Sequence, residues 1–133
     1  MANFLENPEQ FKAELKDKWL DYYQANRSWI KTLMDISGSW CDSVSSYEDE
    51  ELEKFGYDSN YSPRRPDSRF IFGVLNVIEP QIKGLFSLSP ESPTTYIKRL
   101  ALDFDPEIEL KKRPEREKTA SEYLDAIRKE IKT

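Results

Sequence analysis

The chain has 133 residues and a formal net charge of −5 at neutral pH, and 13% of its residues are aromatic. This length and aromatic content are typical of one folded domain, which we place at residues 1–133, and not of a disordered chain. The acidic balance argues against direct nucleic-acid binding, which requires a basic face. Histidine is absent, which removes the commonest general base and metal ligand. This argues against an enzyme without excluding one that uses carboxylates alone, and we expect no catalytic residue, no metal site and no enzymatic activity.

A single cysteine, Cys41, excludes an internal disulfide. No stretch resembles a targeting signal, and no apolar run reaches the roughly 20 residues that span a bilayer. We therefore expect a cytoplasmic protein that does not bind membranes.

The first expected helix begins with Asn7 as N-cap and Pro8 at its first position, and it continues to about Ile36. Its apolar residues follow the heptad spacing of a helix-packing seam, which polar Asn26 interrupts. The seam consists of Leu15, Trp19, Tyr22, Asn26, Trp29, Leu33 and Ile36. Such a seam fits a helix that packs within its own chain, which we favour, or one that pairs with a second chain.

The segment 37–65 is acidic and carries seven acidic against three basic side chains. A connection of this length inside a compact domain is either a mobile linker or a functional lid. We expect one short helix near residues 46–55 and irregular chain elsewhere in the segment.

An apolar stretch at 66–86 follows this segment, with Gly73 and Asn76 as its few interruptions before Glu79 and Pro80. A helix that is apolar nearly all round belongs in the middle of a core. Later helix starts are expected at Ser89–Pro90, Ser92–Pro93 and Asp105–Pro106, and a last helix after Pro114. Because no segment shows strand alternation, we predict an all-α fold, a compact helical bundle around this central apolar helix.

Alternating acids at Asp103, Asp105, Glu107 and Glu109 could suggest a calcium loop. The glycine turn and the distal glutamate of an EF-hand loop are missing. Pro106 directly after Asp105 favours helix capping instead.

A cluster of arginines lies where the chain enters the apolar stretch. Arg64 and Asp67 have the spacing Arg-x-x-Asp, and Arg65 and Arg69 have the spacing Arg-x-x-x-Arg. Both spacings resemble motifs that hold cyclic di-GMP in unrelated proteins, the inhibitory site of diguanylate cyclases and the entry motif of PilZ domains. A guanidinium can bind phosphate oxygens or the guanine edge, or lie flat on the base. The alternative interpretation is a solvated charged loop in which Asp67 or Ser68 only caps a helix.

A wider resemblance rests on three blocks of sequence, residues 18–30, 64–80 and 102–106. Together they resemble a small cyanobacterial all-helical family of formerly unknown function that includes the CdgR-type cyclic di-GMP receptors. The resemblance implies a non-enzymatic second-messenger effector that acts through a protein partner, such as a transcription regulator of the CRP type. The chain departs from the family pattern in its long acidic segment and in Asp67, which leaves the part of Asp67 in guanine recognition open.

The leading hypothesis is therefore a cyclic di-GMP-binding effector without cofactors. The expected ligand-binding residues comprise the arginine cluster, its polar neighbours, and residues of the first helix. They are Asn26, Arg27, Trp29, Tyr61, Arg64, Arg65, Asp67, Ser68 and Arg69. Because the ligand is two-fold symmetric, a homodimer is a natural assembly. The alternative hypothesis is a ligand-free interaction module that docks on another protein through its aromatic first helix and exposes an apolar patch.

Overall fold

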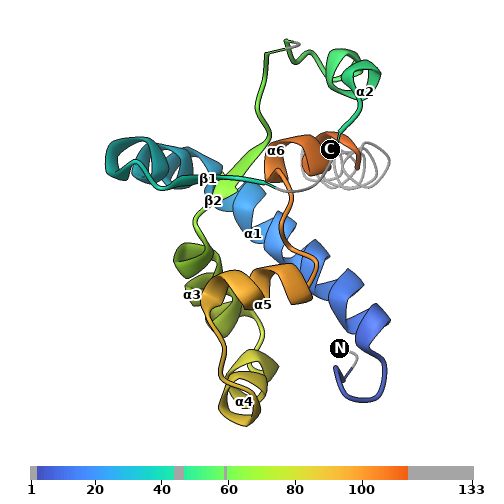
Figure 1. Ribbon diagram of the computed structural model, residues 1–133, viewed down its shortest axis with the longest axis vertical. Helices are drawn as coiled ribbons and strands as arrows, with labels where there is room; N and C mark the ends of the chain where they lie inside the picture. Colours follow the sequence, from blue (N-terminus) through green and yellow to red (C-terminus); the bar gives the residue numbers. More distant parts are fainter. Residues whose placement is uncertain (1–2, 44–46, 59, 114–133) are drawn as a thin grey trace, which may run out of the picture.

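A computed structural model describes residues 3–43, 47–58 and 60–113, and Figure 1 shows the arrangement of their helices and strands. The described chain is mostly helical, as predicted. In chain order the elements are α1 (Pro8–Ser37), β1 (Trp40–Asp42), α2 (Asp49–Lys54), β2 (Arg64–Pro66), α3 (Ser68–Ile78), α4 (Gln81–Leu88), α5 (Pro93–Arg99) and α6 (Pro106–Lys111). The last helix expected from the sequence lies outside the described residues.

The long helix α1 begins and ends where its sequence predicts. The side chain of Asn7 accepts a hydrogen bond from the backbone of Gln10 at 3.2 Å, and Pro8 follows as the first helical residue. Gly38 ends the helix at a φ of 63°, a left-handed conformation that glycine adopts without strain, and its N–H donates to the carbonyl of Met34.

A two-stranded antiparallel sheet joins the two ends of the acidic segment, and here the prediction of irregular chain was wrong. Cys41 of β1 lies opposite Arg65 of β2. Each strand has three residues, too few for an alternating pattern to be recognised in the sequence. The helix expected near residues 46–55 is present as α2.

The apolar stretch at 66–86 does not form one central helix. It is divided at Glu79 and Pro80 into α3 and α4, and α3 buries one face against α1 and α5. Its opposite face is open, because Val77 is 78% exposed and Gly73 is also exposed. The described helices pack on α3 from one side only, so the expectation of a helix buried all round is corrected.

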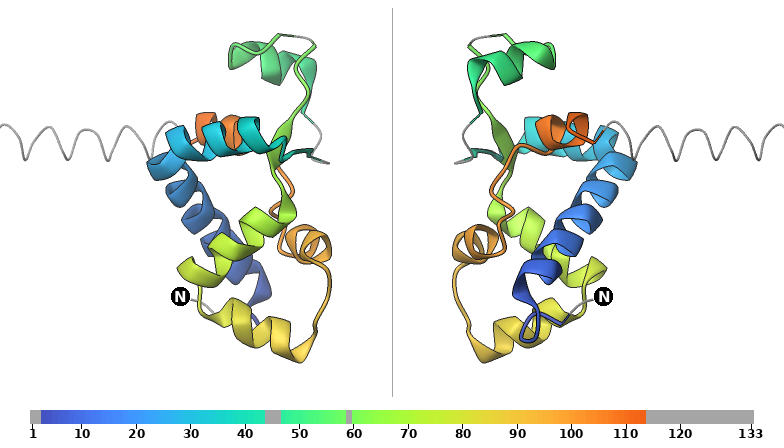
Figure 2. Two further views of the ribbon diagram at one scale, coloured as in Figure 1. Left: turned by 90° about the vertical axis from the view of Figure 1, so that its left-hand side faces the viewer. Right: turned by 90° about the vertical axis from the view of Figure 1, so that its right-hand side faces the viewer.

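Residues 47–58 and 60–61, which we call the α2 lobe, stand away from the helices that form the core (Figure 2). Leu52 is the one residue of α2 that is buried. Tyrosine side chains and lysine contacts tie the lobe to α6: Tyr47 donates to Glu109 at 3.0 Å, and Lys112 lies 2.6 Å from Glu51. The lobe therefore depends on polar contacts with the rest of the protein more than on a core of its own.

Candidate functional site

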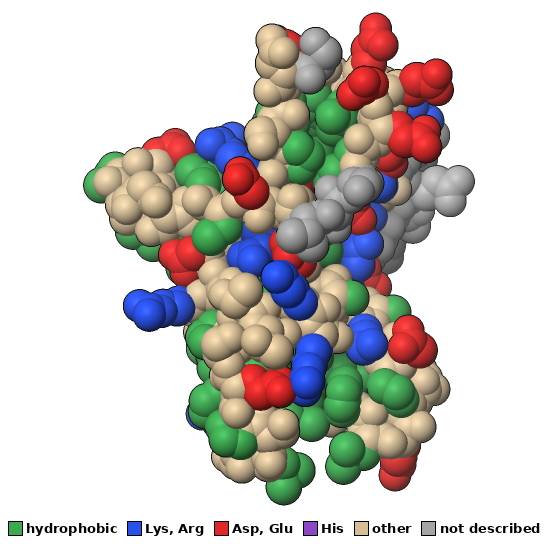
Figure 3. All heavy atoms as spheres, in the orientation of Figure 1, with side chains coloured by type: hydrophobic (Ala, Val, Ile, Leu, Met, Phe, Trp, Pro, Cys, Tyr) green, Lys and Arg blue, Asp and Glu red, His purple; other side chains and the backbone are tan. Residues whose placement is uncertain are grey.

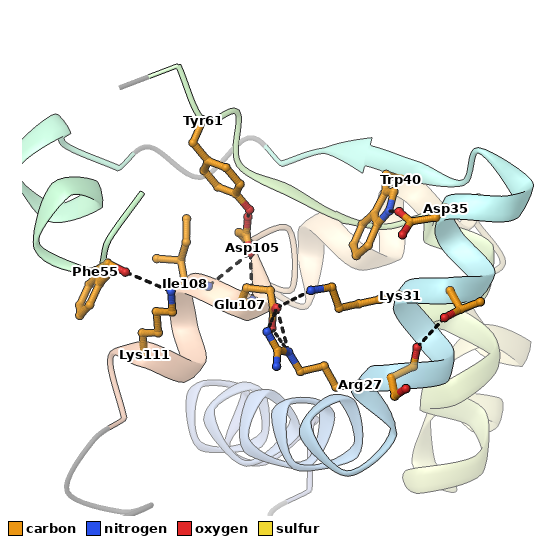
Figure 4. Close-up of polar contacts among 12 residues, drawn as sticks. Arg27, Lys31, Asp35, Trp40, Phe55, Tyr61, Asp105, Glu107, Ile108 and Lys111 are labelled. Atoms are coloured by element: carbon orange, nitrogen blue, oxygen red, sulfur yellow. Dashed lines mark hydrogen bonds and ion pairs between the residues drawn. The ribbon is translucent and has the colours of Figure 1, made fainter. Parts of the chain in front are cut away.

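A cavity of about 210 Å³ lies where α1, α6, the small sheet and the α2 lobe meet (Figure 4). Its lining combines cationic and aromatic side chains with two carboxylates. The lining residues are Arg27, Lys31, Trp40, Tyr57, Tyr61, Arg64, Asp105, Glu107 and Lys111. Four cations and two acids give the cavity a formal charge of +2.

Arg64 reaches the cavity from β2 and lies over an aromatic face. Its guanidinium carbon is 4.0 Å from the centre of the Trp40 ring. Trp40 is on the facing strand, two positions from the residue opposite Arg64, a diagonal distance that a long side chain spans. Among the described residues, no carboxylate forms an ion pair with Arg64. In the part of the chain that the structure describes, the partner of its positive charge is therefore a neutral ring.

Lys111 enters the same cavity from α6, also with neutral partners. Its Nζ lies 4.1 Å from the centre of the Tyr57 ring and donates to the backbone oxygen of Phe55 at 3.0 Å. Tyr57 in turn stacks on Tyr61 at a centroid distance of 4.4 Å. Within the described part of the chain, Lys111 and Arg64 are thus cations that face the cavity without an acidic partner.

Arg27 and Lys31 are already neutralised by the protein. Arg27 donates from Nε to both oxygens of Glu107, at 2.9 and 2.8 Å, and Lys31 lies 3.4 Å from the same carboxylate. Burial alone would raise the pKa of Glu107, but the hydrogen bonds and charges of Arg27 and Lys31 outweigh it and hold the pKa below its usual range. Figure 4 shows this cluster between α1 and α6.

Asp105 is the fully buried acid that fixes the wall of the cavity. Its Oδ1 caps α6, because it accepts hydrogen bonds from the backbone N–H groups of Glu107 and Ile108. Its Oδ2 accepts a hydrogen bond from the backbone N–H of Arg64 at 3.0 Å and another from the hydroxyl of Tyr61 at 2.5 Å. One carboxylate thereby joins α6, β2 and the α2 lobe.

The tyrosines of the site are protonated at physiological pH. Burial, followed by the charges of Asp105 and Glu107, raises the pKa of Tyr57 to about 12. Burial and the hydrogen bond to Asp105 raise the pKa of Tyr61 as well. Both rings are therefore neutral, and they can lie against a flat ligand group without repelling an anion.

Tyr23 does not line the cavity but lies within the electrostatic reach of its charged residues, and its hydroxyl has no hydrogen-bond partner among the residues that the structure describes. Tyr23 is 0% exposed, and burial, then the nearby charges of Glu107 and Asp105, raise its pKa. A buried hydroxyl without a partner is costly, by about 1–3 kcal/mol. It leaves a donor close to the charged residues of the cavity.

The structure divides the nine residues predicted for the site. Arg27, Tyr61 and Arg64 line the cavity. Arg65 does not, because it is 3% exposed and its Nε donates to Asp103 at 2.8 Å. Successive residues of a strand point to opposite faces, so Arg64 and Arg65 cannot grip one ligand together.

The residues that follow Arg65 are occupied in the local structure. Asp67 is the N-cap of α3 and accepts from the backbone of Phe70 at 2.8 Å. Ser68 is buried and accepts from Arg65 and from Thr94. Arg69 is exposed and does not line the cavity. Helix capping, the alternative interpretation of Asp67, is confirmed.

Two predicted residues of α1 also lie outside the cavity lining. Asn26 accepts from Trp29 Nε1 and donates to the carbonyl of Tyr22, both at 2.9 Å. The Trp29 ring lies edge-on to Phe70 at 6.0 Å. The lining residues that the sequence analysis did not assign to the site include Lys31, Trp40, Asp105, Glu107 and Lys111. Lys31 is four residues after Arg27, which places both on one helix face, whereas Trp40 and Lys111 come from elements whose packing is not readable in the sequence.

The alternating acids at 103–109 act within the fold. Asp105 caps α6 as predicted, Asp103 and Glu107 pair with arginines, and Glu109 lies 2.7 Å from Lys16. No group of three metal-binding side chains occurs in residues 3–43, 47–58 and 60–113. Nor does any helix in these ranges have the length and apolar character needed to cross a bilayer.

Fold and site together define a small, mostly helical domain with a cationic, aromatic-lined cavity. The chain belongs to a family of unknown function (DUF5331), whose model matches residues 1–131. No curated protein and no solved structure matches the chain.

Proposed function

We propose that this protein is a non-enzymatic receptor that holds a phosphate-bearing nucleotide, cyclic di-GMP, in the cavity between α1, α6 and the α2 lobe. The observation that carries the proposal is the pair Arg64 and Lys111. Both cations face one cavity, and the partners that the structure gives them are neutral rings and a carbonyl. An anion entering the cavity gains both charges without displacing a carboxylate.

Arg64 has the chemistry that this ligand needs. A guanidinium can bind two phosphate oxygens through parallel hydrogen bonds, or the O6 and N7 atoms of guanine. Trp40, Tyr57 and Tyr61 provide flat apolar surfaces next to the cations, and stacking of a base on an aromatic ring contributes roughly 1–3 kcal/mol. Arg65, Asp67, Ser68 and Arg69 have no part in this revised site.

The cavity is too small to enclose the whole ligand. A volume of about 210 Å³ is below the range of about 300–1,000 Å³ that encloses most drug-sized ligands. An adjoining hollow of about 320 Å³ shares Arg27, Glu107 and Lys111 with the cavity. We expect one guanylyl unit inside the cavity and the second over this hollow.

The proposed output is binding to a protein partner, a transcription regulator of the CRP type in keeping with the sequence resemblance. The α2 lobe supports such a role because Tyr57 and Tyr61 of the lobe line the cavity. A ligand that touches these rings and Lys111 together joins the lobe to α6, and so changes the surface that a partner meets.

Calorimetric titration with cyclic di-GMP tests the proposal. We expect Arg64→Ala and Lys111→Ala each to weaken binding at least about tenfold, equal to 1.4 kcal/mol. Arg69→Ala is the matched control, an exposed arginine outside the cavity, and should retain affinity within about twofold. Absence of binding by the wild type, or an equal loss in the control, refutes the site; GTP binding as tightly as cyclic di-GMP refutes the ligand.

A further inference from the structure

A separate apolar cavity lies away from the cavity that Arg64 lines. Its volume is about 90 Å³, and its wall is formed by the N-terminal segment and by the ends of α4 and α5. In Figure 1, α4 and the N-terminal residues lie at the lower end of the molecule, and α2 and α6 lie at the upper end. The lining consists of Phe4, Leu85, Ser89, Tyr96, Arg99 and Leu100.

The wall of the apolar cavity is held in place by contacts within the protein. The hydroxyl of Tyr96 lies within hydrogen-bond distance of the carbonyl oxygens of Leu85 and Ser89, so its donor is used inside the fold. Phe4 packs edge-on against Phe11 at a centroid distance of 5.5 Å. The cavity is therefore preformed, and its interior offers an entering group apolar contact.

The volume of the apolar cavity limits the kind of group that it can enclose. A dry cavity of about 150 Å³ lined by apolar side chains admits a benzene ring. A volume of about 90 Å³ is too small to enclose a ring, but it has room for part of an unbranched alkyl chain. Each methylene group that leaves water for such a cavity strengthens binding about fourfold.

The rim of the apolar cavity is cationic. Arg99 is 63% exposed, and its Nη1 lies 2.8 Å from Oε2 of Glu91. That oxygen has no hydrogen-bond partner in the described part of the chain, so the two groups are close without a well-aligned bond. The neighbouring Lys98 is exposed and forms no ion pair with an acid among the described residues. Two cations and one acid therefore leave the rim with a formal charge of +1.

We propose that the apolar cavity binds an unbranched aliphatic carboxylate, with the alkyl chain inside and the carboxylate on Arg99 at the rim. Burial of the chain drives entry, and a guanidinium can form two parallel hydrogen bonds to a carboxylate. The exposed hydroxyl of Ser89, also in the lining, can donate to the same head group. A neutral apolar side chain of a partner protein would leave the cationic rim unused.

The surface around the apolar cavity matches such a molecule. Figure 3 shows hydrophobic side chains gathered over the lower end of the protein, with Lys and Arg side chains beside them. A ligand with an apolar tail and an anionic head complements both features. Because this cavity shares no lining residue with the cavity proposed for the nucleotide, the inference does not depend on the proposed function.

A titration followed by ¹⁵N NMR tests the proposal, because it reports the location and the affinity of binding together. We expect hexanoate to shift the amide signals of residues 85–89 and 96–100, and to bind at least about fivefold more tightly than 1-hexanol. From butanoate upward, affinity should rise about fourfold for each added methylene and level off once the cavity is full. Equal affinity for the acid and the alcohol, or shifts centred on another surface, overturns the proposal.

Two substitutions separate the head group from the chain. Arg99→Gln should weaken hexanoate binding about fivefold and leave 1-hexanol binding unchanged. Leu85→Trp should fill the cavity and weaken the binding of both ligands, with an unchanged circular dichroism spectrum. Arg69→Gln is the matched control, since Arg69 is exposed on α3 and lies outside the lining. A control that loses as much affinity as Arg99→Gln, or a folded Leu85→Trp variant that binds both ligands like the wild type, refutes the site.

Discussion

Arg65 and Asp103 form a buried ion pair in which Arg65 Nε lies 2.8 Å from Asp103 Oδ1, and both side chains are less than 10% exposed. The remaining guanidinium nitrogens of Arg65 donate to the backbone oxygen of Pro66 and to Ser68. Its neighbour Arg64 points to the other face of β2 and lines the cavity. Two adjacent arginines therefore have different tasks, one in stability and one in the proposed binding.

Removal of Arg65 should destabilise the fold. An Arg65→Met substitution leaves Asp103 buried without its cationic partner, and breaking a buried pair in this way costs about 3–5 kcal/mol. The free energy of unfolding in urea measures the loss. Arg64→Met should cost about 1 kcal/mol or less, because it removes only a partly exposed cation–π contact. The double variant Arg65→Met, Asp103→Leu should recover much of the stability, and a double variant as unstable as the single one contradicts this account.

Loss of the α3 cap should weaken the fold without changing ligand affinity. Asp67→Ala removes the hydrogen bond to the Phe70 backbone, which should lower the free energy of unfolding by about 1 kcal/mol. Because Asp67 does not line the cavity, cyclic di-GMP should bind this variant as tightly as it binds the wild type. Asp67→Asn, which retains a capping oxygen, is the control for stability. A large loss of affinity in Asp67→Ala would restore Asp67 to the site.

Stability should fall in acid because of the carboxylates that join α6 to α1. The pKa values of Glu107 and Glu109 lie below the ordinary value of 4.5, since bonds from Arg27 and Lys16 outweigh the effect of burial. A pKa that is lower in the folded than in the unfolded chain adds stability above the unfolded-state pKa. That stability is lost as the pH falls below about 4.5 through the folded-state values.

Urea titrations at a series of pH values measure this dependence. The double variant Glu107→Gln, Glu109→Gln should be less stable at neutral pH. Its free energy of unfolding should also fall less steeply than that of the wild type as the pH is lowered. Glu53→Gln, which changes an exposed acid of the α2 lobe, should keep the wild-type slope. An unchanged slope in the double variant excludes these two carboxylates as the source.

Neutralising Glu107 should strengthen anion binding. In Glu107→Gln, Arg27 and Lys31 lose their carboxylate partner and can turn their charge to a ligand in the cavity. We expect affinity for cyclic di-GMP and for inorganic pyrophosphate to rise severalfold at low salt, and the gain to shrink as salt is added. Titration of both ligands at two salt concentrations measures the effect. Weaker binding of both by a folded Glu107→Gln variant would mean that Glu107 positions Arg27 for the ligand.

Local signals in the sequence predicted some helix boundaries and missed others: the start expected at Ser89–Pro90 is wrong, because Ser89 is the C-cap of α4 and the next helix begins at Pro93. Asn7 with Pro8 and Asp105 with Pro106 combine a capping side chain with a proline at the first helical position, and both helices begin there. Such signals depend on neighbouring residues alone. The two strands escaped prediction because three residues are too short for a period to appear.

The candidate site was predicted only in part, because it depends on packing between distant segments. The sequence drew attention to Arg64 and Tyr61, but it could not show that Lys111 lies on the ring of Tyr57 or that Asp103 neutralises Arg65. Adjacent arginines look equivalent in a sequence. The alternation of a strand that could not be predicted is what separates them.

The pairing of Cys41 with Arg65 has a consequence for insertions and deletions. Asp42 and Arg64 face each other at the end of the sheet, so the segment between them leaves and rejoins the body at one place. Relatives can therefore differ in the length of the segment between these two residues at little cost in folding free energy, because loop-closure entropy grows slowly with length. One residue gained or lost inside β2 is different, since a shift of one position reverses the faces of a strand. Such a shift would point the side chain of Arg65 toward solvent and would place the side chain of Arg64 in the interior, opposite Asp103.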